Sequence, residues 1–361
     1  MKSVLIVASE PAPGMIPFAV SMYEIIEKSD KIKPYLIMQN RNYTDYRKHL
    51  DSSSTVFHVD FPNSYVLRCI NKIFPYKLVH AINSIMKNED IKDLHLITGD
   101  FSLWLYVLLF WGRNGKKLYY TVHDLVPHEE SKKQKLLKKI FNDYLYFAER
   151  KIRSISFNLM TCSASQYKCL VDMYQRKKIS FIHFPSLVSY NIKNGKEKVS
   201  ELENEQNYIL FFGRADYYKG IDLLVDAYLR LNLNCKLVIA GSGNAMYMED
   251  ERIIRINRFI NDEEICDLFS KAALVVFPYR NATMSGVFSI PMYYRKKIVA
   301  SNIPFFEQYK DSDIHYFDTG DVASLTNAIK VCLSETKEVN SDYTNYYSES
   351  LIRSEMESFY M

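Results

Sequence analysis

A cluster of glycine and cationic residues in the second half of the chain has the composition of a phosphate-binding loop. Residues 213–220 read GRADYYKG and directly follow an apolar run. Gly213 would let a ligand approach the backbone, Arg214 would form paired hydrogen bonds with phosphate oxygens, and Lys219 would add a point charge. The same residues also fit an ordinary strand–loop–helix with two solvated cations, so this cluster alone does not distinguish a phosphate-binding loop from an ordinary connection.

Two further clusters follow along the chain. Residues 240–244 (AGSGN) come after a strand-like run, although a lone G-x-G is at least as often a plain turn as a ligand loop. Residues 277–287 (FPYRNATMSGV) end a third run and are followed by a predicted helix. Free N–H groups at a helix start suit a diphosphate, and an ordinary capped helix is the competing interpretation. The residues at this helix start are Thr283, Ser285, Gly286 and Val287.

The elements that must position these clusters alternate between short apolar strands and amphipathic helices, which predicts an α/β fold with largely parallel sheets. In the first half we expect strands at 4–8, 35–38, 56–59, 94–98, 118–122, 159–162 and 179–183, and helices at 17–28, 64–87, 101–111, 132–153 and 164–174. In the second half we expect strands at 208–212, 236–240, 253–256, 274–277 and 298–300, and helices at 221–231, 262–272, 285–294, 322–333 and 343–360.

A length of 361 residues favours two domains. The polar segment 189–207 lacks apolar periodicity and is interpreted as a linker. It would separate an N-terminal, acceptor-side domain (1–188) from a donor domain (208–340), with a C-terminal helix (341–361) for which packing on the N-terminal domain is one option. Two Rossmann-like domains in tandem would face a cleft lined by the carboxyl ends of both sheets.

The order of the motifs resembles the donor-binding domain of family 4 glycosyltransferases, which have the GT-B fold. The motifs are G-R-x4-K-G, A-G-x-G, R-F-I-x-D-E-E-I, V-V-F-P-Y and S-G-V, and residues 257–279 match best. The resemblance implies transfer of a sugar from a nucleotide-diphosphate sugar, with retention, to a glycan or lipid-linked acceptor in bacterial surface polysaccharide synthesis. It also implies that the donor is bound by Gly213, Arg214, Lys219, Arg258, Thr283, Ser285, Gly286 and Val287, with Arg214 and Lys219 stabilising the leaving diphosphate.

The first half carries a weaker match. His123 follows the run Tyr119–Val122 and resembles a strand-end histidine that lies near the transferred sugar in these enzymes. Asp124 would cap or orient the same loop. Gly14 is the single glycine of the loop Pro11–Met15, where relatives have a glycine-rich loop on the acceptor side.

One departure from the family pattern matters. Most members carry two glutamates eight positions apart, and the aligned residues here are Ala282 and Ile290. The resemblance implies that the leaving phosphate accepts the acceptor's proton, so no carboxylate base, metal or other cofactor is expected. Two alternatives stay open: a non-catalytic GT-B subunit that binds a sugar or supports a partner enzyme, and a nucleotide-sugar 2-epimerase.

Charge is unevenly distributed along the chain. Residues 1–200 contain 30 Lys and Arg against 18 Asp and Glu, whereas residues 201–361 contain 16 against 24. The segment Ser131–Arg153 interleaves basic and apolar residues at helical spacing, which is typical of a solvated surface helix or of one that contacts an anionic membrane. No nucleic-acid-binding module is recognised.

The cysteines and the N-terminus indicate the compartment. The six cysteines form no C-x-x-C pair, and the N-terminal apolar run is too short for a signal peptide. We therefore expect a cytoplasmic protein, with peripheral contact to the inner face of the membrane as an option. The apolar run Phe101–Trp111 is shorter than the ~20 residues of a membrane-spanning helix and predicts a buried helix.

Overall fold

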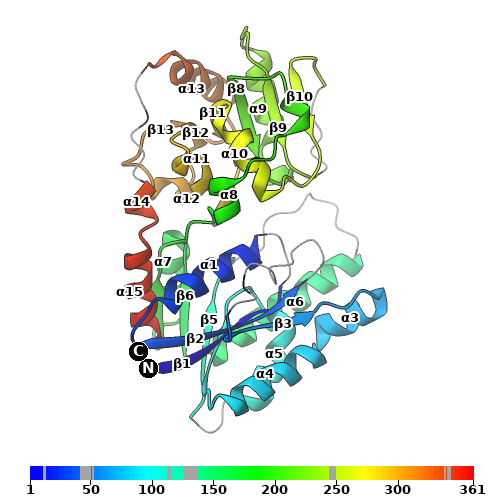
Figure 1. Ribbon diagram of the computed structural model, residues 1–361, viewed down its shortest axis with the longest axis vertical. Helices are drawn as coiled ribbons and strands as arrows, with labels where there is room; N and C mark the ends of the chain where they lie inside the picture. The colour runs from blue at the N-terminus through cyan, green and yellow to red at the C-terminus, as the bar shows by residue number, and fades with distance from the viewer. Residues whose placement is uncertain are drawn as a thin grey trace. The chain divides into compact units, whose positions relative to one another are not determined.

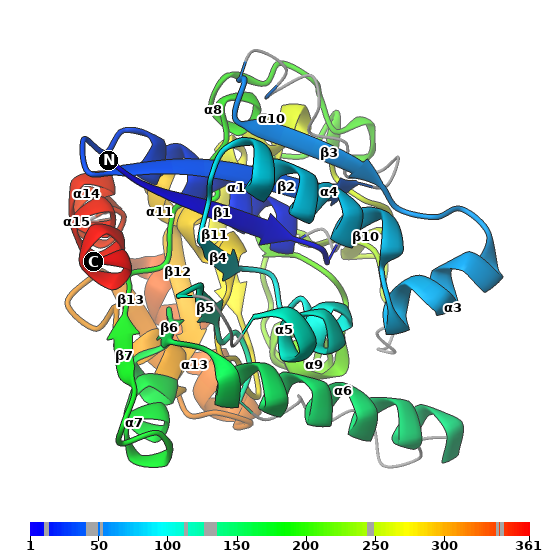
Figure 2. The ribbon, with the colours of Figure 1, turned by 90° about the horizontal axis from the view of Figure 1, so that it is seen from below.

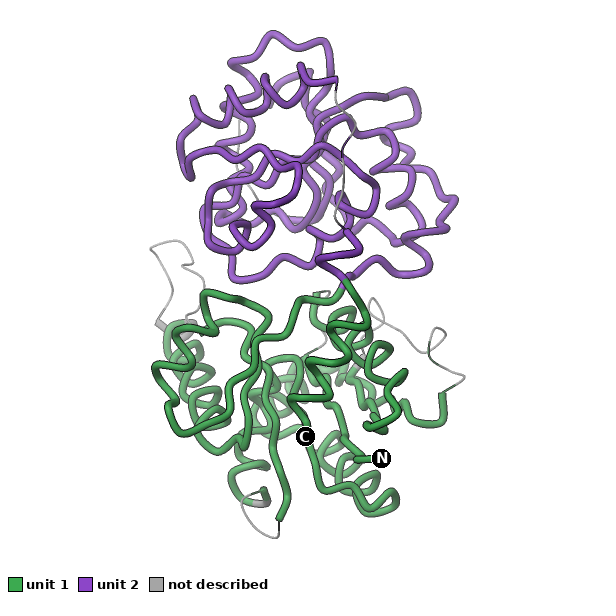
Figure 3. The backbone as a smooth tube through the Cα atoms, turned by 90° about the vertical axis from the view of Figure 1, so that its left-hand side faces the viewer, with its two compact units in different colours: residues 1–125, 133–185, 348–361 green, residues 126–132, 186–347 purple. Residues whose placement is uncertain are grey.

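The computed structural model describes residues 1–10, 14–40, 50, 53–111, 115–125, 136–243, 249–336, 339 and 343–361. The chain divides into two compact units (Figure 3). Unit 1 consists of residues 1–125, 133–185 and 348–361, and unit 2 of residues 126–132 and 186–347. The C-terminal segment therefore belongs to unit 1.

Unit 1 is built on a seven-stranded parallel sheet whose strand order is β3-β2-β1-β4-β5-β6-β7 (Figure 1). The strand order reverses between β1 and β4. After β1 the chain adds β2 and β3 on one side of the sheet and then adds β4 to β7 on the other side. The strands are β1 (Lys2–Ala8), β2 (Ile32–Asn40), β3 (Val56–Asp60), β4 (Asp93–Leu96), β5 (Lys117–Thr121), β6 (Asn158–Thr161) and β7 (Lys178–Phe181).

Helices cover both faces of this sheet. One face buries a core shared by residues of α4 (Tyr76–Asn88), α5 (Trp104–Phe110), α6 (Leu136–Ile155) and α7 (Ala164–Met173). On the other face α1 (Met15–Glu27) contacts α15 (Glu349–Tyr360). A further helix, α3 (Tyr65–Ile73), precedes α4.

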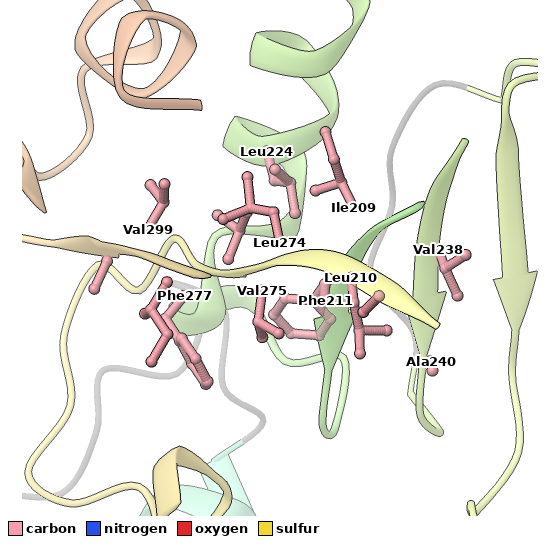
Figure 4. Packing of buried hydrophobic residues seen from close by; sticks show 14 of the residues in the cluster. Ile209, Leu210, Phe211, Leu224, Val238, Ala240, Leu274, Val275, Phe277 and Val299 are labelled. Carbon is pink, nitrogen blue, oxygen red and sulfur yellow. The ribbon is translucent and has the colours of Figure 1, made fainter. Parts of the chain in front are cut away.

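Unit 2 has a six-stranded parallel sheet of order β10-β9-β8-β11-β12-β13. Fully buried aliphatic and aromatic side chains of β8, β9 and β11 fill its core (Figure 4). Its strands are β8 (Tyr208–Phe212), β9 (Leu237–Ala240), β10 (Ile253–Ile256), β11 (Ala272–Phe277), β12 (Lys297–Ser301) and β13 (Ile314–Phe317). Its helices are α8 (Tyr190–Asn194), α9 (Ile221–Leu229), α10 (Asp262–Ser270), α11 (Ser289–Tyr293), α12 (Pro304–Glu307), α13 (Val322–Ser334) and α14 (Tyr343–Tyr346).

These two parallel α/β units confirm the predicted fold class, while four predicted helices are wrong in extent. The helix expected over 101–111 begins as a 3₁₀ turn, Phe101–Leu103, before α5. The helix expected over 64–87 is two helices, because Pro75 cannot continue α3 and instead precedes α4. The helix expected over 343–360 breaks before Ser348, whose hydroxyl caps α15. The helix expected over 285–294 is a 3₁₀ turn, Gly286–Phe288, followed by the five residues of α11.

The polar segment 189–207 contains α8 and a short 3₁₀ turn, Ser200–Leu202. Its apolar residues Ile192, Val199 and Leu202 are buried in the core of unit 2, so the segment packs as part of that unit. The six cysteines form no disulfide, and Cys69 and Cys169 are exposed. Among the helices that the structure describes, none combines the length and apolar character needed to cross a bilayer.

Candidate active site

Two loops meet where the strand order of unit 2 reverses. β8 pairs with β9 on one side and with β11 on the other, so the strand order reverses between β8 and β11. The loops that follow these two strands begin side by side at the carboxyl edge of the sheet, which is the usual ligand position in such folds. The backbone N–H of Arg280 donates to the carbonyl oxygen of Tyr218 over 2.7 Å. The Arg280 guanidinium also forms two hydrogen bonds of 2.9 and 2.6 Å with Asp222. These bonds hold the two loops together.

Gly220 allows the closest approach between the loops. It ends the first loop with φ +65°, and a Cβ there would lie 2.0 Å from the carbonyl oxygen of Pro278. Any other residue would push the second loop away. The sequence cluster 213–220 therefore has one glycine whose role is packing.

Lys219 lies between these loops with its side chain buried. Its Nζ is 5.2 Å from the ring centroid of Tyr279 and 5.9 Å from that of Tyr218. On the remaining side is Gly213, where an added Cβ would lie 2.9 Å from Nζ. Burial lowers the pKa of Lys219 below its ordinary value.

Within the described parts of the chain, the Lys219 ammonium forms no ion pair and no hydrogen bond. Aromatic faces attract a cation but do not replace its hydration shell. A buried, unpaired charge is unfavourable, and an anion reaching Nζ past Gly213 would satisfy it. The environment of Lys219 therefore favours an anionic ligand at these loops.

Arg214 is the exposed cation of the same loop. Its side chain is 68% exposed, and its Nε forms a 2.6 Å ion pair with Asp216. An exposed pair of this kind contributes little to stability, so an anionic ligand can compete with Asp216 for the guanidinium. No sequence pattern indicates this role of Asp216, because only the folded loop shows the pairing.

The second cluster, AGSG, packs against the first. The N–H of Ala215 donates to the carbonyl oxygen of Ser242 over 2.9 Å, and Ala215 forms an isolated parallel bridge with Gly243. A Cβ on Gly241 would lie 2.2 Å from the carbonyl oxygen of Gly213. The glycines thus allow two loops to run in contact, which supports the plain-turn interpretation for Gly241. Asn244 lies outside the described residues.

The third cluster reaches the site through Tyr279. The Tyr279 hydroxyl lies 3.5 Å from Oγ of Ser285, while the Tyr279 ring contacts Lys219. Burial raises the pKa of Tyr279. Tyr279 therefore lies between Lys219, which is next to Gly213, and Ser285. Sequence reasoning missed this role because V-V-F-P-Y reads as a strand end.

The other residues of this cluster are less specific. Thr283, Gly286 and Val287 lie on the same loop and turn as Ser285, and the first hydrogen bond of the turn runs from the N–H of Phe288 to the carbonyl oxygen of Ser285. The short 3₁₀ turn and α11 offer a smaller dipole than the predicted helix would.

Ala282 and Ile290, the positions aligned with the family's glutamates, are both buried in the apolar core of unit 2. A carboxylate at either place would have to be accommodated in that core. The positions at which this sequence lacks the family's glutamates thus also have apolar surroundings, which do not suit a carboxylate.

Arg258 is engaged elsewhere. Its guanidinium forms hydrogen bonds of 2.8 and 2.9 Å with Glu201 and of 2.8 and 2.6 Å with Glu264. These bonds lower the pKa of Glu201 to about 2. Glu264 caps α10 through the N–H of Asn261, so Arg258 links the turn Ser200–Leu202 to the start of α10. These contacts satisfy the Arg258 guanidinium, so a structural role explains this residue without a bound ligand.

In unit 1, His123 follows β5 and is buried. Its Nε2 lies 2.6 Å from the carbonyl oxygen of Ile97, in the loop after β4, so Nε2 must carry the proton and donate. Burial lowers the pKa of His123 although Asp124 acts in the opposite sense. A neutral His123 with Nε2–H therefore presents Nδ1 as an acceptor.

Asp100 is the residue of this region that the sequence analysis missed. It is buried, with φ +46°, and its carboxylate accepts hydrogen bonds of 2.7 Å each from the N–H groups of Ser9 and Thr98. It thereby joins the loops after β1 and β4, at the point where the strand order of unit 1 reverses. A lone Gly-Asp pair after a strand gives no sequence signal for this role.

Gly14 precedes α1 with φ −89°, and a Cβ there would meet nothing within 4 Å. The described structure therefore gives no steric reason for glycine at this position. Residues 11–13 of the same loop lie outside the described residues.

Comparison with known sequences supports one domain type. Residues 206–335 match the family described as Glycosyl transferases group 1. An uncharacterized glycosyltransferase of Methanocaldococcus jannaschii is 34% identical over 88 residues, which are 21% of this chain and 22% of that protein. The match thus spans about a fifth of the curated relative's length.

Solved structures of similar fold cover nearly the whole chain. Sucrose-phosphate synthase of Thermosynechococcus elongatus has a TM-score of 0.69 at 15% identity, covering 100% of this chain and 97% of that one. HepE of Anabaena, in complex with UDP and glucose, has a TM-score of 0.69 at 13% identity and 99% coverage of both chains. UDP-GlcNAc 2-epimerase of M. jannaschii has a TM-score of 0.61 at 13% identity and 100% coverage of both. At such identities the likeness shows a shared GT-B fold.

Proposed function

We propose that this chain is a glycosyltransferase that moves a sugar from a nucleotide-diphosphate sugar, such as UDP-glucose, to a glycan or lipid-linked acceptor. The match of residues 206–335 to a glycosyltransferase family supports transfer, and the complexes of the fold neighbour HepE with UDP support a nucleotide donor. We further propose that the donor binds unit 2, within residues 208–340.

The observation that carries this proposal is the buried Lys219 ammonium, which forms no ion pair or hydrogen bond with the described residues and lies at the strand-order reversal. A diphosphate that enters past Gly213 would pair with Lys219 and draw Arg214 away from Asp216. Ser285 would add a hydroxyl, and Thr283, Gly286 and Val287 stay predicted donor contacts.

The proposed reaction forms a bond between the acceptor hydroxyl oxygen and the anomeric carbon and breaks the bond from that carbon to the β-phosphate oxygen. The hydroxyl proton passes to the leaving nucleoside diphosphate, and the anomeric configuration is retained. Negative charge grows on the diphosphate as the bond breaks. Lys219 and Arg214 would stabilise that charge, and such preorganised donors typically contribute ~100-fold or more to the rate.

His123 of unit 1 would act in sugar binding rather than as a general base. Its proton is committed to the carbonyl oxygen of Ile97, and its lowered pKa keeps the ring neutral, so Nδ1 would accept a hydrogen bond from a sugar hydroxyl. Asp124 would orient the same loop, and Gly14 stays a predicted acceptor-side residue.

The cellular role proposed is bacterial surface polysaccharide synthesis in the cytoplasm, with peripheral contact to the inner face of the membrane. The excess of basic residues in positions 1–200 supports an anionic surface or acceptor as the partner of unit 1.

Calorimetry with UDP-glucose tests the donor site. Lys219→Met keeps the length of the side chain and removes the charge, and we expect it to weaken binding by about 10- to 100-fold, the range of one charged hydrogen bond. Lys296→Met is the matched control, because Lys296 is also partly buried but its Nζ already donates to the carbonyl oxygens of Ser270 and Ala272. Equal affinity in wild type and Lys219→Met would remove Lys219 from the site.

One observation favours a second candidate, a non-catalytic subunit that binds a nucleotide sugar. Ala282 and Ile290 are buried among apolar side chains and carry no carboxylate. Prolonged incubation of purified protein with labelled UDP-glucose separates the two: release of UDP, by transfer or hydrolysis, supports the enzyme, and tight binding without release supports the subunit.

A further inference from the structure

Helix α3 of unit 1 buries a polar residue and exposes apolar ones, which is the reverse of an ordinary surface helix. Its only buried residue is Asn71, whose side-chain amide pairs with that of Gln39 on β2 over 3.4 and 3.5 Å. On the opposite side Val66, Ile70 and Ile73 recur at helical spacing and are each more than half exposed. Surface helices normally bury such a face, so its exposure indicates a partner.

The neighbouring elements extend this face. α3 meets α6 where the Nζ of Lys72 lies 5.0 Å from the ring centroid of Phe141, and α5 packs on α6 through Trp104 and Phe147. Among the described side chains of the three helices, the exposed aliphatic and phenylalanine residues are Val66, Leu67, Ile70, Ile73, Leu108, Leu109, Ile140, Phe147 and Ile155, which we call the apolar surface. Figure 2 shows α3, α5 and α6 on the side of unit 1 away from α15.

Charge and aromatic residues around α3 identify the partner. Residues 61–88 contain no Asp or Glu, whereas Lys72 and Lys77 are exposed beside the apolar face. Tyr65 begins α3, and Tyr76, three residues beyond its end, begins α4; these side chains are 74% and 70% exposed. An apolar face with basic residues beside it and amphipathic aromatic rings at its ends matches the layering of a lipid headgroup region.

We infer that α3 inserts its apolar face into an anionic lipid monolayer and docks unit 1 on the membrane. This inference deepens the proposed function, on which it rests for the lipid-linked acceptor. α3 begins five residues after β3 ends, at the same carboxyl edge of the sheet that carries His123 after β5. Docking through α3 would therefore present that edge close to the lipid surface.

Flotation of the full chain with vesicles tests the inference. We expect wild type to float with phosphatidylcholine vesicles that contain phosphatidylglycerol and to bind pure phosphatidylcholine much less. Ile70→Glu should reduce flotation by at least about tenfold, because it places a charge at the centre of the inserted face. Lys72→Gln with Lys77→Gln should lower the dependence on anionic lipid, at about fivefold per basic residue.

Met173→Glu is the matched control. Met173 is the last residue of α7, which leads into the edge strand β7, whereas α3 follows the opposite edge strand, β3. Met173 is 58% exposed, so the variant should float like wild type. Tyr65→Trp provides a second readout: its emission should shift to shorter wavelength only when vesicles are added. UDP-glucose affinity should stay unchanged in Ile70→Glu, which separates a failure of docking from a failure of the donor site.

Two results would overturn the inference. One is flotation of Ile70→Glu at the wild-type level. The other is a wild-type protein that ignores anionic vesicles at low salt but self-associates in a way that Ile70→Glu abolishes, because the apolar surface would then be an interface between proteins.

Discussion

Lys219 is held in an environment that favours ligand binding over stability. Its ammonium is buried against Tyr279 and Tyr218, burial lowers its pKa, and it forms no direct ion pair with a described residue, although the nearby Asp216 acts in the opposite sense on the pKa. Arg214, only five positions earlier, is exposed and already paired with Asp216. The two cations of one loop thus have different electrostatic states, which the sequence pattern G-R-x4-K-G does not distinguish.

This environment leads to a prediction about stability. Lys219→Met should leave the free energy of unfolding unchanged or raise it by about 1–2 kcal/mol, because replacing an unpaired buried charge with an apolar chain relieves its desolvation. Lys296→Met should instead lower it by about 1–3 kcal/mol, because two carbonyl oxygens lose their donor. Urea denaturation measures both. A loss of more than about 2 kcal/mol in Lys219→Met would mean that the ammonium is structural.

Among the elements, the loops after β8 and β9 depend on contact between their backbones. Gly241 has φ +138°, and a Cβ there would clash with the carbonyl oxygen of Gly213 at 2.2 Å. Gly241→Ala should therefore destabilise unit 2 by about 1–3 kcal/mol. Gly14→Ala should be neutral or stabilising by about 0.4–1 kcal/mol, because its backbone is helical and its surroundings are open. Thermal unfolding compares the two variants. Equal effects would contradict the packing role assigned to Gly241.

Periodicity predicted most elements because it depends on neighbouring residues alone. All the expected strands are present, but β13 was missed since its four residues, IHYF, are mostly polar or aromatic and the first three are only half-buried. The breaks at Pro75 and Ser348 were passed over because apolar spacing continues across them. The motif order predicted Gly213, Lys219 and Ser285, which the fold brings together. Tyr279, Asp216 and Asp100 were missed, because their partners are chosen only by tertiary structure.

At the scale of the whole chain, the last residues complete the unit formed by the first. Tyr360 is fully buried in unit 1, where its hydroxyl lies 2.6 Å from Nδ1 of His95 on β4. Burial lowers the pKa of His95 to about 3, so that ring stays neutral. Glu355 accepts hydrogen bonds of 2.9 and 2.8 Å from the backbone N–H and the ring of His183. α15 is thus a structural part of unit 1.

Tyr360→Ala should consequently destabilise unit 1 by about 3–5 kcal/mol while unit 2 keeps its stability. The sheets have separate cores, so denaturant unfolding followed by hydrogen exchange can report on each unit. Slow-exchanging amides of β1 and β4 should lose protection and those of β8 and β11 should retain it. Equal loss in both sheets would contradict the assignment of α15 to unit 1.

We propose above all that a nucleotide-diphosphate sugar binds unit 2 at the loops after β8 and β11. Hydrogen exchange of the wild-type chain with and without UDP-glucose tests it most directly, because it locates the ligand without relying on catalysis. We predict new protection in residues 213–220 and 278–288, and unchanged exchange in residues 258–264, where Arg258 is already engaged by Glu201 and Glu264. Protection confined to other segments, or none at saturating UDP-glucose, would contradict the account.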